Sequence, residues 1–197
     1  ANMKLNLPKE VLEIINKFKA ANYQIYIVGG AVRDLLLKID VNDWDFTTDA
    51  TPEEILKLFP NGFNNNNFGT VGIPINVIQG SKATPESSED SGQARMTNEV
   101  FEITTMRKEG EYRDSRHPDE VSWTDKIEED LKRRDFTINA IAYDVIAQQD
   151  REGVIASEAK QSTQLIDPFF GQDDLKNKII QAVGNPDLRF KEDALRL

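Results

Sequence analysis

Near the N-terminus, a strand pattern, a glycine pair, a short helix and a second strand pattern follow one another, and this succession constrains the fold most. Residues 23–28 are apolar and rich in β-branched and aromatic side chains, which predicts a buried strand. Gly29 and Gly30 end this run, and residues 31–37 have the spacing of a short helix. Residues 42–47 alternate polar and aromatic side chains and predict a second strand. This order brings the glycine turn and the second strand to one place.

The second strand pattern carries paired carboxylates, Asp43 and Asp45. Residues two apart in a strand face the same side, so both carboxylates project together while Trp44 and Phe46 face the core. Two like charges this close are unfavourable unless they are protonated or bridged by a cation. Oxygen ligands suit Mg²⁺ better than zinc, and Mg²⁺ ions there would activate an attacking hydroxyl and steady a leaving pyrophosphate. The alternative is a polar strand end on a solvated edge. Glu102, in a later strand pattern, is either a third ligand or an ordinary outward-facing glutamate.

The glycine pair is a candidate phosphate site. The backbone N–H groups of Gly29 and Gly30 can approach a phosphate at the positive end of the following helix. Arg33, one turn further on, can bind the same phosphate. A plain tight turn is the alternative.

Two later segments supply further candidate binding residues. Arg134 can reach a triphosphate or ribose, Asp135 can accept from a ribose hydroxyl, and Asn139 lies one turn further on. Asp193 and Arg196 are three residues apart on one helix face, where together they can mimic a base-pairing edge to a nucleotide. A surface ion pair or a capping role is the alternative in each case.

The composition excludes several kinds of site. The chain has no cysteine and one histidine, His117, which rules out disulfides, thiolate metal sites and multi-histidine zinc sites. His117 lies in a charged loop and is expected to be solvated or structural. With 34 acidic and 24 basic side chains the net charge is −10, and the pI is about 4.7, so nucleic-acid binding cannot rest on overall basicity. No apolar run approaches the ~20 residues that span a bilayer, so we expect a cytoplasmic protein with no membrane partner.

The remaining patterns predict helices and strands around this segment. Helices are predicted for residues 8–21, 51–60, 125–134 and 136–143 and after Pro186, and strands for 69–78, 100–106 and 179–183. The helix at 51–60 opens with a capping box of Thr51 and Glu54, with Pro52 in its first turn. Residues 79–98 and 147–164 are polar and are predicted to be insertions.

In combination, these segments resemble the bacterial class II tRNA nucleotidyltransferase family, which comprises CCA-adding enzymes and bacterial poly(A) polymerases. The motifs that carry the resemblance occur in the order residues 29–34, 43–45, 101–107, 128–140, 167–171 and 189–196. The resemblance implies an α+β, polymerase-β-like nucleotidyltransferase head domain, a small mixed sheet backed by helices, over residues 1–171. The start of a helical neck is implied for residues 172–197.

The resemblance also implies roles for the candidate residues. It implies that Asp43, Asp45 and Glu102 bind Mg²⁺ and that Gly30 and Arg33 contact the triphosphate. It implies that Arg134 and Asp135 hold the nucleotide and its ribose. It also implies that Asp193 and Arg196 select C or A without a nucleic-acid template. The implied reaction is attack of a tRNA 3′-hydroxyl on the α-phosphate of CTP or ATP, with release of pyrophosphate.

Some features depart from the family pattern. Lys38 stands where the family usually has glycine, and the two insertions replace short turns. The chain ends inside the nucleotide-selecting motif, so the helical domains that grip tRNA are absent and a separately encoded C-terminal domain is an expected partner. A poly(A) polymerase, a partial enzyme that adds only CC or only A, and a non-catalytic nucleotide-binding subunit stay as alternatives. Residues 68–71 and the charged loop 111–118 favour complete CCA addition.

Overall fold

The computed structural model describes residues 7–65, 69–78, 96–109, 121–146 and 162–192. The helices are α1 (Lys9–Ala20), α2 (Gly30–Leu37), α3 (Pro52–Leu58), α4 (Ile127–Lys132), the 3₁₀ turn η1 (Thr137–Asn139), α5 (Gly171–Asn177) and α6 (Pro186–Glu192). The strands are β1 (Ile25–Val28), β2 (Asp45–Thr48), β3 (Phe63–Asn64), β4 (Thr70–Ile78), β5 (Met96–Thr105), β6 (Arg107–Glu109), β7 (Val121–Trp123), β8 (Ala142–Ile146) and β9 (Ser162–Ile166). In these ranges, no helix has the length and apolar character needed to cross a bilayer.

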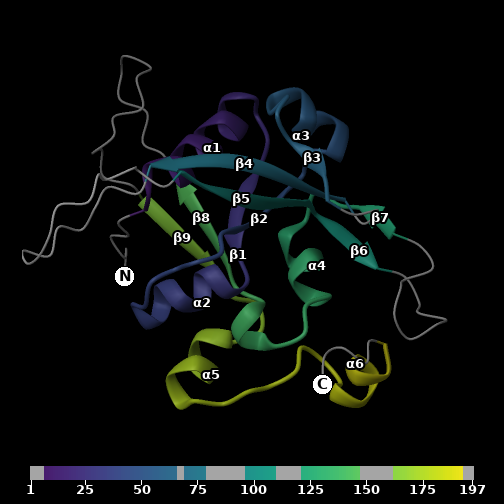
Figure 1. The fold of residues 1–197 in the computed structure, drawn as a ribbon. Coiled ribbons are helices and arrows are strands. Elements are labelled where there is room, and N and C mark those ends of the chain that lie inside the picture. The colour runs from purple at the N-terminus through teal and green to yellow at the C-terminus, as the bar shows by residue number, and fades with distance from the viewer. Residues whose placement is uncertain (1–6, 66–68, 79–95, 110–120, 147–161, 193–197) are drawn as a thin grey trace, which may run out of the picture.

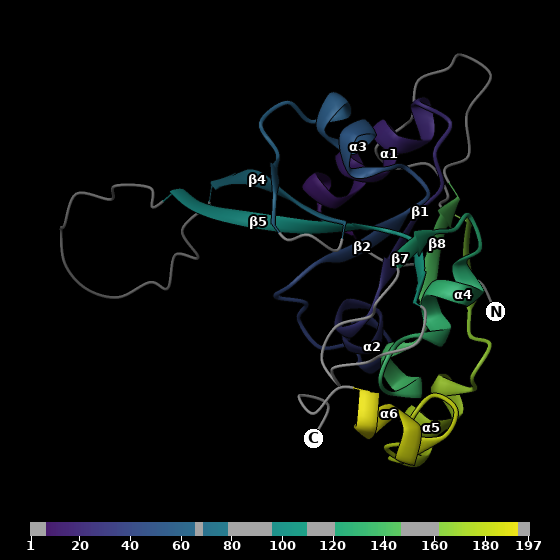
Figure 2. The same cartoon turned by 90° about the vertical axis from the view of Figure 1, so that its right-hand side faces the viewer.

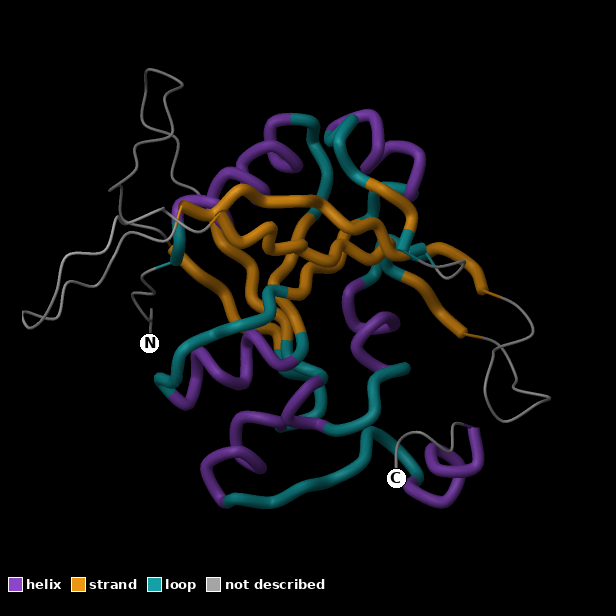
Figure 3. The backbone as a smooth tube through the Cα atoms, in the orientation of Figure 1, coloured by secondary structure: helices purple, strands orange, loops and turns teal. Residues whose placement is uncertain are grey.

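Seven strands form one mixed sheet in the order β3-β4-β5-β2-β1-β8-β9, and β6 and β7 form a separate hairpin ladder (Figures 1 and 3). Strand β2 pairs in parallel with β5, whereas the other neighbours in the large sheet are antiparallel. A mixed sheet backed by helices is the fold class that the sequence predicts.

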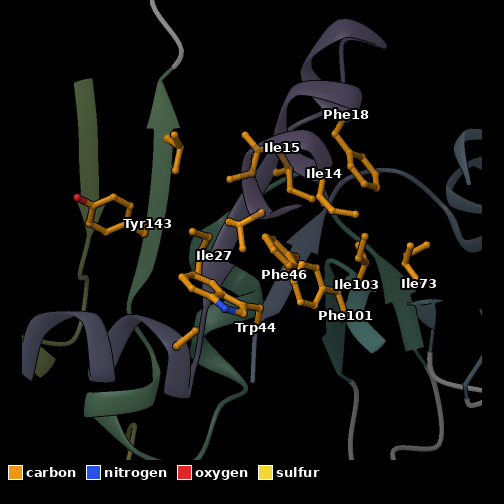
Figure 4. Packing of buried hydrophobic residues seen from close by; sticks show 14 of the residues in the cluster. Ile14, Ile15, Phe18, Ile27, Trp44, Phe46, Ile73, Phe101, Ile103 and Tyr143 are labelled. Carbon is orange, nitrogen blue, oxygen red and sulfur yellow. The ribbon is translucent and has the colours of Figure 1, made fainter. Parts of the chain in front are cut away.

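Strand β1 lies inside the sheet and is buried on both faces. Ile25 and Ile27 belong to the larger core, whereas Tyr26 and Val28 belong to a second, smaller core on the opposite face. Figure 4 shows the larger core, where apolar side chains of α1 meet those of the central strands. The continuous apolar run at 25–28 therefore reflects burial on two faces rather than one.

Helices cover both faces of the sheet. Helix α1 buries a stripe with helical spacing, Val11, Ile14, Ile15 and Phe18, against the larger core. Figures 1 and 2 show α1 and α3 together on one side of the sheet and α4 on the other. The shorter α4 closes the second core, and the candidate carboxylates lie on its side of the sheet.

Three predicted elements differ most from those in the structure. The strand predicted at 42–47 begins only at Asp45. The helix predicted at 136–143 is instead the short turn η1 followed by β8, because its last residues pair with β1 and split their side chains between the two cores. Residues 179–183 form a single isolated bridge, between Phe136 and Ala182, rather than a strand of either sheet.

The two predicted insertions lie mostly outside the described residues. The last three residues of the first insertion, 96–98, belong to β5, and the last three of the second, 162–164, belong to β9. The insertions therefore fall at the ends of sheet strands, where added length leaves the described sheet pairing in place.

We expect loss of the capping box of α3 to lower the free energy of unfolding. The backbone N–H of Glu54 donates to Thr51 Oγ1 at 3.4 Å, and the backbone N–H of Thr51 donates to Glu54 Oε2 at 2.8 Å. In urea denaturation, Thr51→Ala should lower the free energy of unfolding by about 1 kcal/mol. Thr51→Ser should leave the free energy of unfolding close to that of the unaltered protein. Equal urea midpoints for the Ala and Ser variants would contradict this reading.

We expect Lys38→Gly to stabilise the protein. Lys38 caps the C-terminus of α2 in the left-handed conformation, with φ 59°, which costs a residue with a Cβ more than it costs glycine. Thermal or urea unfolding should show a gain of about 1 kcal/mol for Lys38→Gly and none for Lys38→Ala. A gain shared by both variants would mean that the lysine side chain, and not the backbone, is the source of strain.

Candidate functional site

The glycine turn brings together residues that lie far apart in the sequence. Gly29 precedes α2 with φ 69°, a conformation that favours glycine. A Cβ placed on Gly29 would lie 3.2 Å from Nη1 of Arg134 and 3.3 Å from Oδ2 of Asp45. The guanidinium and the carboxylate therefore flank the same turn, which a larger residue would crowd. Gly30 is the first residue of α2.

The carboxylates gather at the start of β2. Asp45 opens this strand and is in register with Glu102 of the parallel strand β5, so both side chains lie on one face. Asp43 is exposed in the preceding segment, while Trp44 and Phe46 are buried as the alternation predicts. Burial raises the pKa of Asp45, repulsion from Glu102 and Asp43 raises it further, and the charge of Arg134 opposes the shift. Asp45 is thus a partly buried carboxylate that the exposed carboxylates of Asp43 and Glu102 repel.

A cation bound by Asp43 and Asp45 would relieve this repulsion, and the all-oxygen donor set suits Mg²⁺. Among the described residues, no group of three or more acidic or histidine side chains is already placed to hold a metal ion. Glu102 instead accepts a hydrogen bond from Nδ2 of Asn65 at 2.6 Å. The two aspartates supply oxygen donors of the kind that such a metal takes, and Glu102 can join them as a third ligand while its Oε1 stays bonded to Asn65, because a carboxylate has two oxygens.

Arg134 is held by a buried carboxylate that the sequence motifs do not single out. Asp130 is fully buried on α4, and its Oδ2 lies 3.6 Å from Nη2 of Arg134. Burial lowers the pKa of Arg134, whereas the carboxylates of Asp130, Asp45 and Asp135 favour its charged form. Within the described part of the chain, Nε of Arg134 has no hydrogen-bond partner. The guanidinium therefore faces the glycine turn with Nη1, whereas its Nε is buried.

Asp130 also joins three other groups to this arrangement. Its Oδ1 accepts from Nε of Arg133 at 2.9 Å and from the backbone N–H of Arg107 at 3.2 Å, and its Oδ2 accepts from Thr47 Oγ1 at 3.4 Å. Asp130 thus connects β2, β6 and the segment after α4. Its spacing of three and four residues from the two arginines is the sequence signal that would have identified it.

A second network extends from α2 to η1. Nε of Arg33 donates to Asp34 at 2.8 Å, and its Nη1 donates to Oδ1 of Asn139 at 3.2 Å. Asn139 in turn donates to Oδ1 of Asp135 at 3.4 Å, and Asp135 accepts the backbone N–H of Phe136 at 2.7 Å. Arg33, Asp135 and Asn139 are therefore brought together, although about 100 residues separate α2 from η1.

The structure gathers most of the predicted site residues at the junction of β1, α2, β2 and η1. The predicted residues it brings there are Gly29, Gly30, Arg33, Asp43, Asp45, Glu102, Arg134, Asp135 and Asn139. Asp193, Arg196 and His117 lie outside the described residues, so their predicted roles stay predictions. Asp130 and Asn65 are the contributors that the sequence reasoning missed.

Comparison with known proteins gives a consistent family match. The family described as the poly A polymerase head domain matches residues 25–181. Curated relatives include the CCA-adding enzymes of Oceanobacillus iheyensis, 40% identical over 184 residues, and of Lactobacillus helveticus, 40% identical over 188 residues. The alignments cover 93% and 95% of this chain but 37% and 38% of those relatives. The chain therefore spans less than two-fifths of the curated relatives that it matches.

A solved structure shows the same arrangement of elements. The CCA-adding enzyme of Bacillus stearothermophilus in complex with CTP aligns with a TM-score of 0.65 and 34% sequence identity. The alignment covers 95% of this chain and 36% of that chain.

Replacing the buried carboxylate should destabilise the protein strongly. Asp130→Asn keeps the volume of the side chain but removes the anion beside Arg133 and Arg134, so we expect a loss of about 3 kcal/mol in urea denaturation. Glu128→Gln, at an exposed position of the same helix, is the control and should change stability by less than about 0.5 kcal/mol. A near-neutral Asp130→Asn variant would show that the carboxylate does not hold this arrangement.

Proposed function

The chain belongs to the poly A polymerase head-domain family, as its motifs predict, and from this we propose that it is the catalytic head of a CCA-adding tRNA nucleotidyltransferase. The observation that carries the proposal is the meeting of Asp45 and Arg134 at Gly29. An anionic metal-binding group and a cationic phosphate-binding group lie there on either side of a glycine turn. Transfer of a nucleotide needs these two kinds of group next to each other.

The proposed reaction joins a tRNA 3′-hydroxyl to the α-phosphorus of CTP or ATP. One P–O bond forms, the bond between the α-phosphorus and the bridging oxygen breaks, and pyrophosphate and a proton are released. Catalysis is mainly positioning and neutralisation of charge, because the nucleotide already carries the leaving group. Partly buried polar groups around Asp45 suit this task, since charges interact more strongly there than in water.

Each described residue has a task in this proposal. Backbone N–H groups of Gly29 and Gly30, with the guanidinium of Arg33, bind the triphosphate at the start of α2. Arg134 contributes a second cation at the same turn. Asp43 and Asp45 would hold Mg²⁺, with Glu102 as a third carboxylate ligand beside its hydrogen bond to Asn65. Bound Mg²⁺ supplies neutralisation of the developing negative charge and a more acidic hydroxyl.

The ribose and the base have their own proposed contacts. Asp135 and Asn139, already joined to each other and to Arg33, accept and donate hydrogen bonds to the ribose. Asp193 and Arg196 read the base as C or A. A carboxylate acceptor and guanidinium donors three residues apart in the sequence offer the hydrogen-bond pattern that such a choice requires.

The named relatives support the choice of substrate. They are CCA-adding enzymes, and the Bacillus stearothermophilus structure contains CTP. Because this chain covers 37% of the Oceanobacillus iheyensis relative, we propose residues 1–171 as the head and 172–197 as the start of a neck, with tRNA held mainly by a further C-terminal segment. We propose the cytoplasm as the place of action, where tRNA and nucleoside triphosphates meet.

Poly(A) addition is the second candidate, because the matched family takes its description from poly A polymerase. The two activities differ in acceptor and nucleotide. A CCA-adding enzyme extends tRNA that lacks CCA by three residues with CTP and ATP together, whereas a poly(A) polymerase extends unrelated RNA with ATP alone.

Replacing either aspartate should abolish nucleotide transfer. We expect Asp43→Asn and Asp45→Asn to lower incorporation of labelled CMP and AMP into tRNA lacking CCA by at least about 100-fold. The assay uses the chain alone and fused to the remaining segment of the Oceanobacillus iheyensis relative. Asp40→Asn, an exposed aspartate just before the strand, is the matched control and should retain activity.

Three results would count against the proposal. Full activity of both aspartate variants would remove the metal-binding role. Tailing of unrelated RNA with ATP alone would favour poly(A) polymerase. Absence of transfer in the fused protein, with unimpaired binding of CTP and ATP, would leave a nucleotide-binding subunit without catalysis.

A further inference from the structure

Four strands place one residue each in a row that leads from the sheet edge to the candidate carboxylates. Phe63 of β3 is in register with Gly72 of β4, Gly72 with Glu102 of β5, and Glu102 with Asp45 of β2. Directly opposed residues of neighbouring strands share a face of the sheet. Phe63 therefore lies on the same face as the two carboxylates. Figure 3 shows these strands side by side.

The ring of Phe63 is held in place by the absence of a side chain at Gly72. A Cβ on Gly72 would lie 2.6 Å from Cζ and 3.0 Å from Cε2 of the ring, so only glycine admits the ring in this position. Gly72 is buried beneath it, yet Phe63 keeps 45% of its surface exposed. The ring thus lies about one strand spacing, ~5 Å, from the strand of Glu102 and presents an open surface there.

The two sides of Asp45 differ in chemistry. On the β1 side lie Gly29 and Arg134, which suit a triphosphate. On the β5 side lie Glu102, Asn65 and then the exposed ring of Phe63. A transfer reaction brings two substrates to one carboxylate from different directions, so the side without the phosphate-binding groups is left for the acceptor. An exposed aromatic ring binds nucleobases by stacking and accepts any base.

We infer that Phe63 stacks against a base at the 3′ end of the RNA acceptor and so positions the terminal hydroxyl beside Asp45 and Glu102. The ring lies one strand spacing, ~5 Å, from the strand of Glu102. The ribose between a base and its 3′-hydroxyl spans a comparable distance. Asn65, two residues after Phe63, donates to Oε1 of Glu102 and so links this segment to the carboxylate. This inference rests on the proposed transfer reaction and adds to it the contact for the second substrate.

Binding is tested with the full chain and a single-stranded RNA oligonucleotide that carries 2-aminopurine at its 3′ end. Stacking on an aromatic ring quenches this base. We expect quenching with the unaltered protein and with Phe63→Tyr, and an apparent Kd about tenfold weaker, with reduced quenching at saturation, for Phe63→Leu. Phe170→Leu, at an exposed aromatic position just before α5 and outside the row, should behave as the unaltered protein.

Kinetics give the second measurement. In the transfer assay Phe63→Leu should raise the KM for RNA about tenfold and leave the KM for CTP unchanged, and Phe63→Tyr should restore the RNA value. Unfolding curves of the variants separate this effect from loss of structure, because a destabilised protein would lose activity without a selective change in the KM for RNA.

Different results separate this inference from the proposed function. No quenching by the unaltered protein, or equal quenching and RNA KM for the Leu and Tyr variants, would overturn the role of Phe63. Phe63-dependent quenching in a protein that transfers no nucleotide, even when fused to the C-terminal segment of a relative, would support the base contact and refute the reaction.

Discussion

Asp130 is fully buried, and its carboxylate meets groups from β2, from β6 and from the segment that follows α4. Removing a charge from water is costly unless partners and hydrogen bonds replace the lost hydration. Around Asp130, the hydroxyl of Thr47 and the backbone N–H of Arg107 supply hydrogen bonds, and Arg133 and Arg134 supply the opposite charge. The same contacts that make the charge tolerable also fix Arg134 beside the glycine turn, so the stability of the second core and the geometry of the candidate site depend on one interaction.

The position of Asp45 divides the site into two halves. Toward β1 lie a glycine turn and a guanidinium, and toward β5 lie a second carboxylate and an exposed ring. The division follows from topology, because β2 is the strand between β1 and β5. A residue at the start of β2 therefore meets both halves. In the proposed reaction this arrangement keeps nucleotide and acceptor apart except at the carboxylate where they must react.

Sequence patterns were reliable where local chemistry decides the outcome. The capping box at Thr51 and the alternation around Asp45 occur as predicted. The sequence patterns failed where a partner far away in the chain decides which structure a segment forms. A helix was predicted at 136–143, yet residues 142–146 form β8, which pairs with β1 and β9. Residues 179–183 look like a strand but find a bridge only at Ala182. The contributions of Asp130 and Asn65 depend on such distant partners as well.

The sequence by itself determined the kinds of group present and their local setting: a glycine pair at the start of a helix, two aspartates at the start of a strand, and motifs that identify the family. Those features depend on neighbours within a few residues, which the chain specifies directly. Only the tertiary structure decided that Arg134 lies against Gly29 and that Phe63 shares a row with Glu102. These contacts join segments separated by tens of residues, and strand order, register and burial bring them together.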